Sequence, residues 1–351
     1  MSDTDPLRAR IDELMDAEGI TVNRSLVRRI LATGLDLGRD GTERLDLKIT
    51  AAAVEEMRSA FRLFAPYDGA SKVTVFGSAR TKDHDPLYAQ AEQVAASLAR
   101  LGWMVVTGAG PGIMQAAAEG AGPELSIGVS IRLPFEEKPN AIVAADPNHV
   151  TMKYFFTRKL MLMKESRGFV SLPGGFGTLD ETFELLTLQQ TGKAEPVPIV
   201  LLDRPGGTYW DGLRRFIDHE LVPAGLIARD DLDRVLITDS VEAAAAEITG
   251  FWRNYDSLRW VGTTLVLRLK AEPTDAEIRT LDARFRHLVA AGTIHRTPPL
   301  PPEIQDGDRL ELPRIALTLD QHRVGDLFRL IGAINALESS VHAASPGLAP
   351  T

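Results

Sequence analysis

From Lys72 to Trp252, short runs of β-branched and other apolar residues alternate with windows of helical periodicity. This alternation predicts an α/β fold with a parallel, doubly wound sheet and helices on both faces. Ligands of such sheets bind beyond the carboxyl ends of the strands, so functional residues are expected in the strand-to-helix turns. The expected strands are 73–76, 103–107, 126–131, 142–144, 169–172, 199–202 and 235–237, and the expected helices are 88–100, 113–120, 152–164, 179–190, 210–220 and 241–252.

The pattern differs on either side of this stretch. Residues 1–70 are polar and helical in spacing, which predicts a helical N-terminal arm that packs on the main domain or on a second subunit. Residues 71–255 form the predicted main domain, residues 256–345 a small C-terminal α+β appendage, and residues 346–351 a disordered tail. Within the last third we expect a linker at 253–262, strands at 263–269 and 314–319, helices at 275–291 and 323–337, and a rigid proline-rich connector at 297–302.

Composition excludes several classes of function. The chain has 39 basic and 48 acidic residues, a net charge of -9, and no basic segment, so nucleic acid is not expected as a partner. No apolar run is long enough to cross a membrane, and no secretory signal is visible, which predicts a cytoplasmic protein without a membrane partner. The chain has no cysteine and its seven histidines are scattered, so neither a metal site nor a cofactor is expected.

The most specific motif follows the strand expected at 169–172. Its turn contains Pro173, Gly174 and Gly175, and Gly177 and Thr178 begin a helix whose first N–H groups lack partners. A phosphate placed there meets several donors and the positive end of the helix dipole. Asp180 and Glu181 are expected in the first turn; dipole complementation accounts for one carboxylate, and the second indicates chemistry.

Two earlier turns have a similar character. Gly77 and Ser78 follow the first strand, where backbone N–H groups, a hydroxyl and Arg80 suit an anion. The second strand ends at Gly108, Gly110, Gly112 and Met114, a GxGxG pattern that is neither the dinucleotide fingerprint nor a P-loop and that also occurs in ordinary tight turns. Arg158 and Lys159 lie on the helix before the motif strand, where a solvated helix face is the simpler interpretation.

Taken together, Pro173 to Glu181 and the upstream pair Arg158-Lys159 resemble the PGGxGTxxE motif and Arg-Lys pair of the LOG (Lonely Guy) family, whose members are often labelled lysine decarboxylases. The turns at Gly77-Ser78 and Gly108 to Met114 match in order and spacing. The resemblance covers about residues 70–255. The chain departs from the family at Phe76, where plant-like members tend to have cysteine, and at Ala109, where many members have glycine; alanine is tolerated there unless the backbone needs a positive φ.

The resemblance implies a Rossmann-like domain that hydrolyses the N-glycosidic bond of a nucleoside 5′-monophosphate. AMP or an N6-substituted AMP, the cytokinin precursor, would give free base and ribose 5-phosphate in a homodimer or higher homo-oligomer. Glu181 would stabilise the positive charge that develops on the ribose, and Arg158 would orient the phosphoribose or the carboxylate; no general acid is assigned. The substrate and phosphate would contact Gly77, Ser78, Gly108, Gly110, Gly112, Met114, Lys159, Gly174, Gly175, Gly177 and Thr178, with no metal and no cofactor.

Other interpretations remain open. A non-catalytic protein of the same fold would bind a nucleotide or a molybdopterin-type cofactor, but such relatives typically lose the Arg or the motif Glu, and both are present here. A true lysine decarboxylase needs pyridoxal phosphate on a suitably placed lysine, and none is evident. The appendage would in a third interpretation bind an effector of the enzyme. Base selectivity is undetermined, because Gln189, Gln190 and Met161 suit either a base pocket or core packing.

Overall fold

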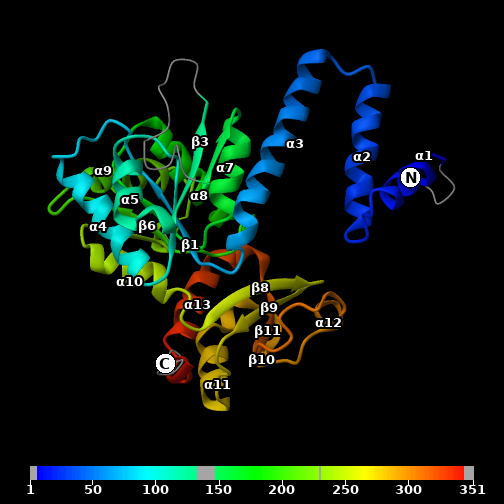
Figure 1. Ribbon diagram of the computed structural model, residues 1–351. Helices are drawn as coiled ribbons and strands as arrows, with labels where there is room; N and C mark the ends of the chain where they lie inside the picture. Colours follow the sequence, from blue (N-terminus) through cyan, green and yellow to red (C-terminus); the bar gives the residue numbers. More distant parts are fainter. Residues whose placement is uncertain (1–5, 133–146, 229–230, 344–351) are drawn as a thin grey trace, which may run out of the picture. The chain divides into compact units, whose positions relative to one another are not determined.

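The computed structural model describes residues 6–132, 147–228 and 231–343, and it divides into two units, Met1–Phe61 and Arg62–Thr351. The first unit is helical, as expected. Ile11 and Met15 pack against Ala32, and Arg28 pairs with Asp12 at 2.6 Å. Its helices are α1 (Pro6–Ala17), α2 (Arg24–Arg39) and most of α3 (Arg44–Phe64), which continues into the second unit (Figure 1).

The second unit contains a seven-stranded, wholly parallel sheet in the order β4-β3-β2-β1-β5-β6-β7. The chain runs outward from β1 to β4 and then returns to place β5 beside β1. The predicted doubly wound α/β class is therefore confirmed, with the reversal of strand order between β1 and β5. The strands are β1 (Lys72–Phe76), β2 (Met104–Thr107), β3 (Ser126–Ile131), β4 (His149–Met152), β5 (Phe169–Ser171), β6 (Ile199–Leu202) and β7 (Val235–Thr238).

Helices cover both faces of this sheet because successive strand residues point to opposite sides. Val73 and Val75 of β1 join an apolar core with α4, α5 and α10, whereas the Thr74 hydroxyl donates to the Leu162 carbonyl of α7 at 3.0 Å on the other face. Figure 1 shows α4, α5 and α10 on one side of the sheet and α7 on the other. On the same side as Thr74, Ser171 of β5 meets Thr182 of α8. The helices are α4 (Pro86–Arg100), α5 (Ile113–Ala121), α7 (Phe155–Lys164), α8 (Phe176–Gln190), α9 (Tyr209–Phe216) and α10 (Val241–Gly250).

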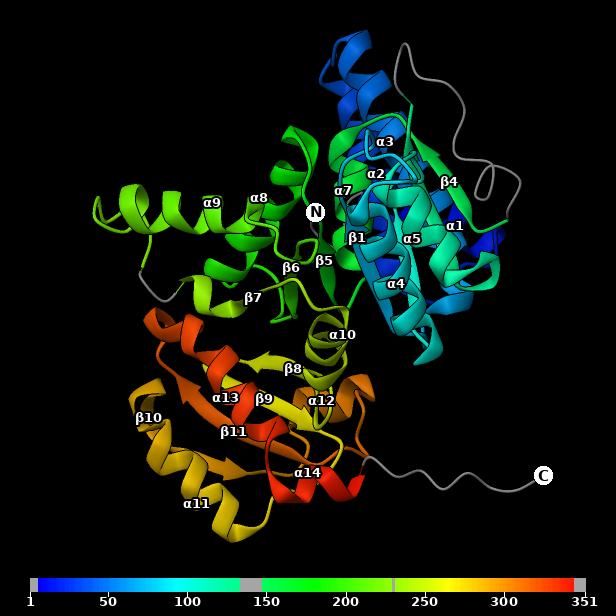
Figure 2. The same cartoon turned by 90° about the vertical axis from the view of Figure 1, so that its left-hand side faces the viewer.

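The C-terminal part of the second unit is a four-stranded antiparallel sheet in the order β10-β11-β9-β8 (Figure 2). Leu265, Leu267 and Ile315 pack against Leu330 and Ile331 of α13 in its core. This agrees with the α+β character expected of the appendage. Its elements are β8 (Tyr255–Val261), β9 (Thr264–Leu269), α11 (Asp275–Arg284), β10 (Val289–Arg296), α12 (Pro301–Asp306), β11 (Arg314–Leu319), α13 (Leu327–Asn335) and α14 (Glu338–Ala343).

Several expected boundaries are wrong. The linker expected at 253–262 is largely strand β8, and the helix expected at 275–291 ends at Arg284, because the chain then turns into the unexpected strand β10. β4 is also unexpected, and it ends at Met152, where the sequence pattern predicts the start of a helix. The strand expected at 142–144 and the tail at 346–351 lie outside the described residues. Within the described ranges, no helix combines the length and apolarity needed to cross a membrane.

Candidate functional site

A cavity of about 780 Å³ opens at the carboxyl ends of β1 and β5, where the strand order reverses. This is the place where doubly wound sheets bind ligands. The turn after β1 and the first two turns of α8 form much of its wall, and α7 contributes from the side. The lining residues are Phe76, Gly77, Ser78, Ala79, Arg80, Gly108, Met114, Phe155, Arg158, Gly175, Phe176, Gly177, Thr178, Leu179, Asp180 and Glu181.

The N-terminus of α8 faces this cavity without a side-chain cap. Gly175 is the N-cap residue, and no side chain accepts a hydrogen bond from the first N–H groups. A Cβ at Gly175 or Gly177 would meet no protein atom within 4 Å, so the backbone here is open to a ligand. The end of the helix can therefore receive an anion through N–H groups and the helix dipole.

The position of the two carboxylates differs from the prediction. Because α8 begins at Phe176, Asp180 and Glu181 are its fifth and sixth residues and lie beyond the first turn, which contains no acidic residue. Complementation of the helix dipole, which acts within the first turn, therefore accounts for neither carboxylate.

Arg158 lies against the turn after β2. Its Nε donates to the Val129 carbonyl at 2.9 Å, and its Nη2 is 3.5 Å from the Gly108 carbonyl. A Cβ on Gly108 would lie 2.0 Å from Nη2, so this position must be glycine for the guanidinium to occupy its place. The side chain is 12% exposed and its Nη1 is 4.0 Å from Glu181 Oε1. The structure thus holds a guanidinium and a carboxylate together in the wall of the cavity.

Glu181 is buried, and its Oε2 has no hydrogen-bond partner within the described residues. Two cations, Arg158 and Lys159, each lie 4.0 Å from its carboxylate. Desolvation by burial raises the pKa of the Glu181 carboxyl to about 7, although both cations act in the opposite direction. A carboxyl that changes protonation near neutral pH and has an unsatisfied oxygen is typical of a reacting group.

Lys159 forms ion pairs with the two carboxylates that flank Glu181 on α8. Its ammonium lies 2.8 Å from both Asp180 and Glu184, one on either side of Glu181 along α8. Burial alone would lower the pKa of Lys159, but the hydrogen bonds to these two carboxylates outweigh it and raise that pKa. Lys159 is not part of the cavity wall. Its ion pairs instead join α7 to α8 near Glu181.

The structure brings most of the predicted site residues together. Gly77, Ser78, Gly108, Met114, Arg158, Gly175, Gly177, Thr178 and Glu181 line the cavity, whereas Gly110, Gly112, Gly174 and Lys159 do not.

Gly112 and Gly174 are instead needed where the turns pack together. Gly112 has a φ of +68° and leaves no room for a Cβ, which would lie 2.4 Å from the Ser78 carbonyl oxygen. A Cβ on Gly174 would lie 2.1 Å from Thr178 Oγ1. These glycines therefore shape the turns around the cavity from within the protein.

None of the candidate base contacts reaches this cavity. Met161 is fully buried in the core, Gln189 Nε2 donates to the Glu195 carbonyl at 2.9 Å, and Gln190 bonds to Asp231. Phe155 and Phe176 line the opening, although no sequence motif marks them. Phe155 precedes Arg158 by three residues on the same helix, and this spacing places both side chains on one face. The spacing was therefore the sequence signal that could have identified Phe155 as a cavity residue.

Tyr209 is a further residue that sequence reasoning missed. Its hydroxyl donates to the Gly174 carbonyl at 2.7 Å, which connects α9 to the motif turn. No motif marks this tyrosine. Its position depends on how α9, which follows β6, packs beside the turn after β5.

Ala109 adopts a left-handed conformation, with a φ of +57°. The condition under which alanine is unfavourable here, a backbone that needs a positive φ, is therefore met. This conformation costs on the order of 1 kcal/mol. Ala109 directly follows Gly108, whose carbonyl is contacted by the Arg158 guanidinium.

Comparisons with known proteins agree with this geometry. Residues 112–248 match the family described as possible lysine decarboxylase. A Mycobacterium marinum protein named cytokinin riboside 5′-monophosphate phosphoribohydrolase is 32% identical over 165 residues, which are 46% of this chain and 84% of that relative. The chain belongs to the LOG family.

A second LOG relative, from Mycobacterium tuberculosis, has the same name and is 32% identical over 170 residues, 47% of this chain and 87% of the relative. The molybdenum cofactor carrier protein from Chlamydomonas reinhardtii is similar in structure at 21% identity and a TM-score of 0.36, over 51% of this chain and 96% of that one.

In the described part of the chain, no three His, Asp or Glu side chains gather as metal ligands would.

Proposed function

We propose that this LOG protein hydrolyses the N-glycosidic bond of a nucleoside 5′-monophosphate, AMP or an N6-substituted AMP, to free base and ribose 5-phosphate. The observation that carries the proposal is the buried Glu181 carboxyl, with an unsatisfied Oε2 among the described residues, in a cavity that it shares with Arg158 and the open N-terminus of α8. The names of the Mycobacterium relatives support the same substrate class.

The 5′-phosphate would bind at the N-terminus of α8. Gly175, Gly177 and Thr178 surround this position, and Ser78 and Arg80 line the same cavity from the turn after β1. Backbone N–H groups and the guanidinium of Arg80 supply positive potential within an acidic protein. The phosphate would then fix the ribose between this helix end and Glu181.

Glu181 in its ionised form would stabilise the oxocarbenium charge that develops at C1′ as the bond to the base breaks. The electron pair of that bond leaves with the base, which takes up a proton, and water supplies the hydroxyl group of ribose 5-phosphate. The carboxylate would position this water or form a covalent ribosyl intermediate, as paired carboxylates do in glycosidases. Arg158, fixed to Val129, would orient the carboxylate or the phosphoribose with its planar guanidinium.

Glu181→Gln tests this assignment. The change removes the ionisable group with little change of shape, so we expect AMP still to bind while adenine release falls by at least about 1,000-fold. Adenine release is measured by chromatography, and AMP binding by calorimetry. Undiminished adenine release in the Glu181→Gln protein would contradict the assignment.

Glu184→Gln is the matched control. Glu184 lies three residues further along α8, also contacts Lys159, and does not line the cavity. We expect it to retain activity within a few-fold of the unchanged chain. If the unchanged protein is stabilised by AMP but releases no adenine, it is a non-catalytic nucleotide binder, which is the alternative from the sequence.

A homo-oligomer is part of this proposal. Phe155, Phe156 and Leu160 of α7 and Phe176 and Phe183 of α8 are large apolar side chains exposed on neighbouring helices. A second copy of the chain would bury them and border the cavity at Phe155 and Phe176. The cytoplasmic location and the absence of a nucleic-acid partner stay predictions from the sequence.

A further inference from the structure

Tyr209 does not line the LOG cavity, but it contacts the turn that leads into α8. Its hydroxyl donates to the Gly174 carbonyl at 2.7 Å, and within the described residues no backbone N–H donates to that carbonyl. Gly174 directly precedes Gly175, the N-cap residue of α8, which lines the cavity. The tyrosine therefore fixes one end of the peptide group that joins these two glycines.

The peptide between Gly174 and Gly175 is weakly restrained by its own residues. Glycine has no Cβ and adopts a wider range of backbone angles than other residues, so a peptide between two glycines rotates at little cost. A Cβ on Gly174 would lie 2.1 Å from Thr178 Oγ1, so this position cannot carry a side chain that would restrict the peptide. A Cβ on Gly175 would meet no protein atom within 4 Å. The hydrogen bond from Tyr209 supplies a restraint that the glycines lack.

Tyr209 is itself held in place at the start of α9. Its backbone N–H donates to Asp203 Oδ2 at 2.9 Å, and Asp203 Oδ1 accepts from the N–H of Arg204 at 2.8 Å. Asp203 is buried directly after β6. The Tyr209 ring packs edge-on against Trp210, which is fully buried, with ring centroids 4.8 Å apart. These contacts place the hydroxyl at the Gly174 carbonyl in the absence of any ligand.

The direction of the Gly175 N–H follows from that of the Gly174 carbonyl. The described chain contains no cis peptide bond, and in a trans peptide the C=O and N–H bonds point in opposite directions. The carbonyl is directed at Tyr209, outside the cavity lining, so the Gly175 N–H is directed to the opposite side of the turn. This N–H makes no hydrogen bond with the described part of the chain and is one of the donors that a helix N-terminus leaves without a partner.

We propose that Tyr209 is a positioning residue of the anion site: it orients the peptide between Gly174 and Gly175 so that the Gly175 N–H donates to the 5′-phosphate. The inference rests on the proposed function, because it needs a phosphate at this end of α8. Tyr209 does not touch the substrate. Without its hydroxyl the peptide can rotate and the phosphate loses one donor, whereas the N–H groups of Phe176 and Gly177 keep the direction that the helix gives them.

Tyr209→Phe tests the proposal because it removes the hydroxyl alone. Calorimetry with ribose 5-phosphate measures the phosphate site without any hydrolysis, and we expect binding to be weaker by about fivefold or more. Adenosine, which has no phosphate, should bind the variant and the unchanged chain equally. With AMP as substrate the KM should rise by a similar factor at an unchanged kcat, since the phosphate contacts are the same in the ground state and the transition state.

Tyr88→Phe is the matched control. It also removes a tyrosine hydroxyl that forms a 2.7 Å hydrogen bond, in this case to Glu119, and Tyr88 does not line the cavity. The affinity of this variant for ribose 5-phosphate should equal that of the unchanged chain. Thermal unfolding establishes that both variants are folded.

Unaltered affinity of Tyr209→Phe for ribose 5-phosphate would overturn the proposal. An equal loss of adenosine affinity would also overturn it, because the change would then affect the cavity as a whole. Absence of ribose 5-phosphate binding to the unchanged chain at millimolar concentration would overturn it as well. Failure of the proposed function gives a different result: the unchanged chain binds ribose 5-phosphate but releases no adenine from AMP, and the effect of Tyr209→Phe on binding still decides the role of this tyrosine.

Discussion

At the scale of single residues, the proposed catalytic residue Glu181 also affects the stability of the fold. Its folded pKa of about 7 lies above the ordinary value of 4.5 because burial disfavours the charged form. The folded state therefore binds this proton more tightly than the unfolded state. The stabilisation is fully present below pH 4.5 and is lost as the pH rises through 7, and its total is about 3 kcal/mol at 1.36 kcal/mol per pKa unit.

This predicts a pH-dependent effect of Glu181→Gln. Glutamine does not ionise, so the variant avoids the cost of a buried charge. Its free energy of unfolding, relative to that of the unchanged chain, should be higher by about 3 kcal/mol at pH 8 than at pH 4.5. Urea denaturation at the two pH values measures this difference. Other titrating groups are common to both proteins and cancel in the comparison.

Glu184→Gln again provides the control, since Glu184 lies on the same helix, contacts the same lysine and is partly exposed to solvent. The difference between the two pH values should be much smaller than for Glu181→Gln, because the ionisable Glu181 is retained. If the Glu181→Gln difference were the same at pH 4.5 and pH 8, the unusual protonation of Glu181 in the folded state would be refuted.

At the scale of elements, the N-terminus of α8, which has no side-chain cap, is the proposed phosphate site. Gly177→Ala adds a methyl group that meets no protein atom within 4 Å. Because Gly177 lines the cavity, this methyl group would occupy space that the proposed phosphate needs. We expect the helix to be retained or stabilised, by up to about 1 kcal/mol, while the KM for AMP rises by about tenfold or more. Thermal unfolding and steady-state kinetics measure the two effects.

Gly212→Ala on α9 is the matched substitution, because a methyl group added at Gly212 would also meet no atom within 4 Å, and this residue does not line the cavity. It should give a similar gain in stability with an unchanged KM. Equal KM values in the two variants would argue against phosphate binding at this end of α8.

The sequence pattern failed to predict two strands, β4 and β10. β4 and β10 are edge strands of their sheets, and β10 is largely exposed. Edge strands lack the continuous apolar pattern of a buried strand, because one or both of their faces meet solvent. The central strands β1, β2 and β5 are buried throughout and were predicted to within one or two residues.

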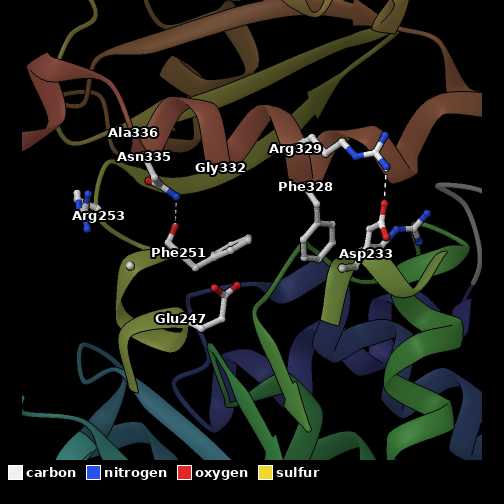
Figure 3. Close-up of a pocket in the computed structure, with 11 residues that line it drawn as sticks. Asp233, Glu247, Phe251, Arg253, Phe328, Arg329, Gly332, Asn335 and Ala336 are labelled. Atoms are coloured by element: carbon white, nitrogen blue, oxygen red, sulfur yellow. Dashed lines mark hydrogen bonds and ion pairs between the residues drawn. The ribbon is translucent and has the colours of Figure 1, made fainter. Parts of the chain in front are cut away.

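At the scale of the whole molecule, Asn335 of α13 joins the four-stranded antiparallel sheet to the segment that follows α10. Its Oδ1 accepts hydrogen bonds from the backbone N–H groups of Asn254 at 2.8 Å and Tyr255 at 2.9 Å, and its Nδ2 donates to the Phe251 carbonyl at 2.5 Å (Figure 3). All three partners lie where the chain leaves α10 and enters β8. One buried amide thus satisfies three backbone groups at the connection.

Asn335→Leu should therefore destabilise the protein by about 2–4 kcal/mol, because three buried polar groups lose their partners. Urea denaturation followed by tryptophan fluorescence measures the loss, and Trp252 reports directly on this connection. Arg329→Lys is the control: it alters an exposed ion pair on the same helix and should change the free energy of unfolding by less than about 1 kcal/mol. An Asn335→Leu protein as stable as the unchanged chain would show that the amide is dispensable.

The sequence by itself determined the α/β class, the order of the turns that form the site and the residue types that they contain. These are local properties: glycines set the turns after β2 and β5, and the motif sets the residues that enter α8. Only the tertiary structure decided that Glu181 is desolvated while Asp180, its neighbour, pairs with Lys159. Burial and pairing depend on α7 and on the turns after β1 and β2, which lie far from α8 along the chain and reach it only through the order of strands in the sheet.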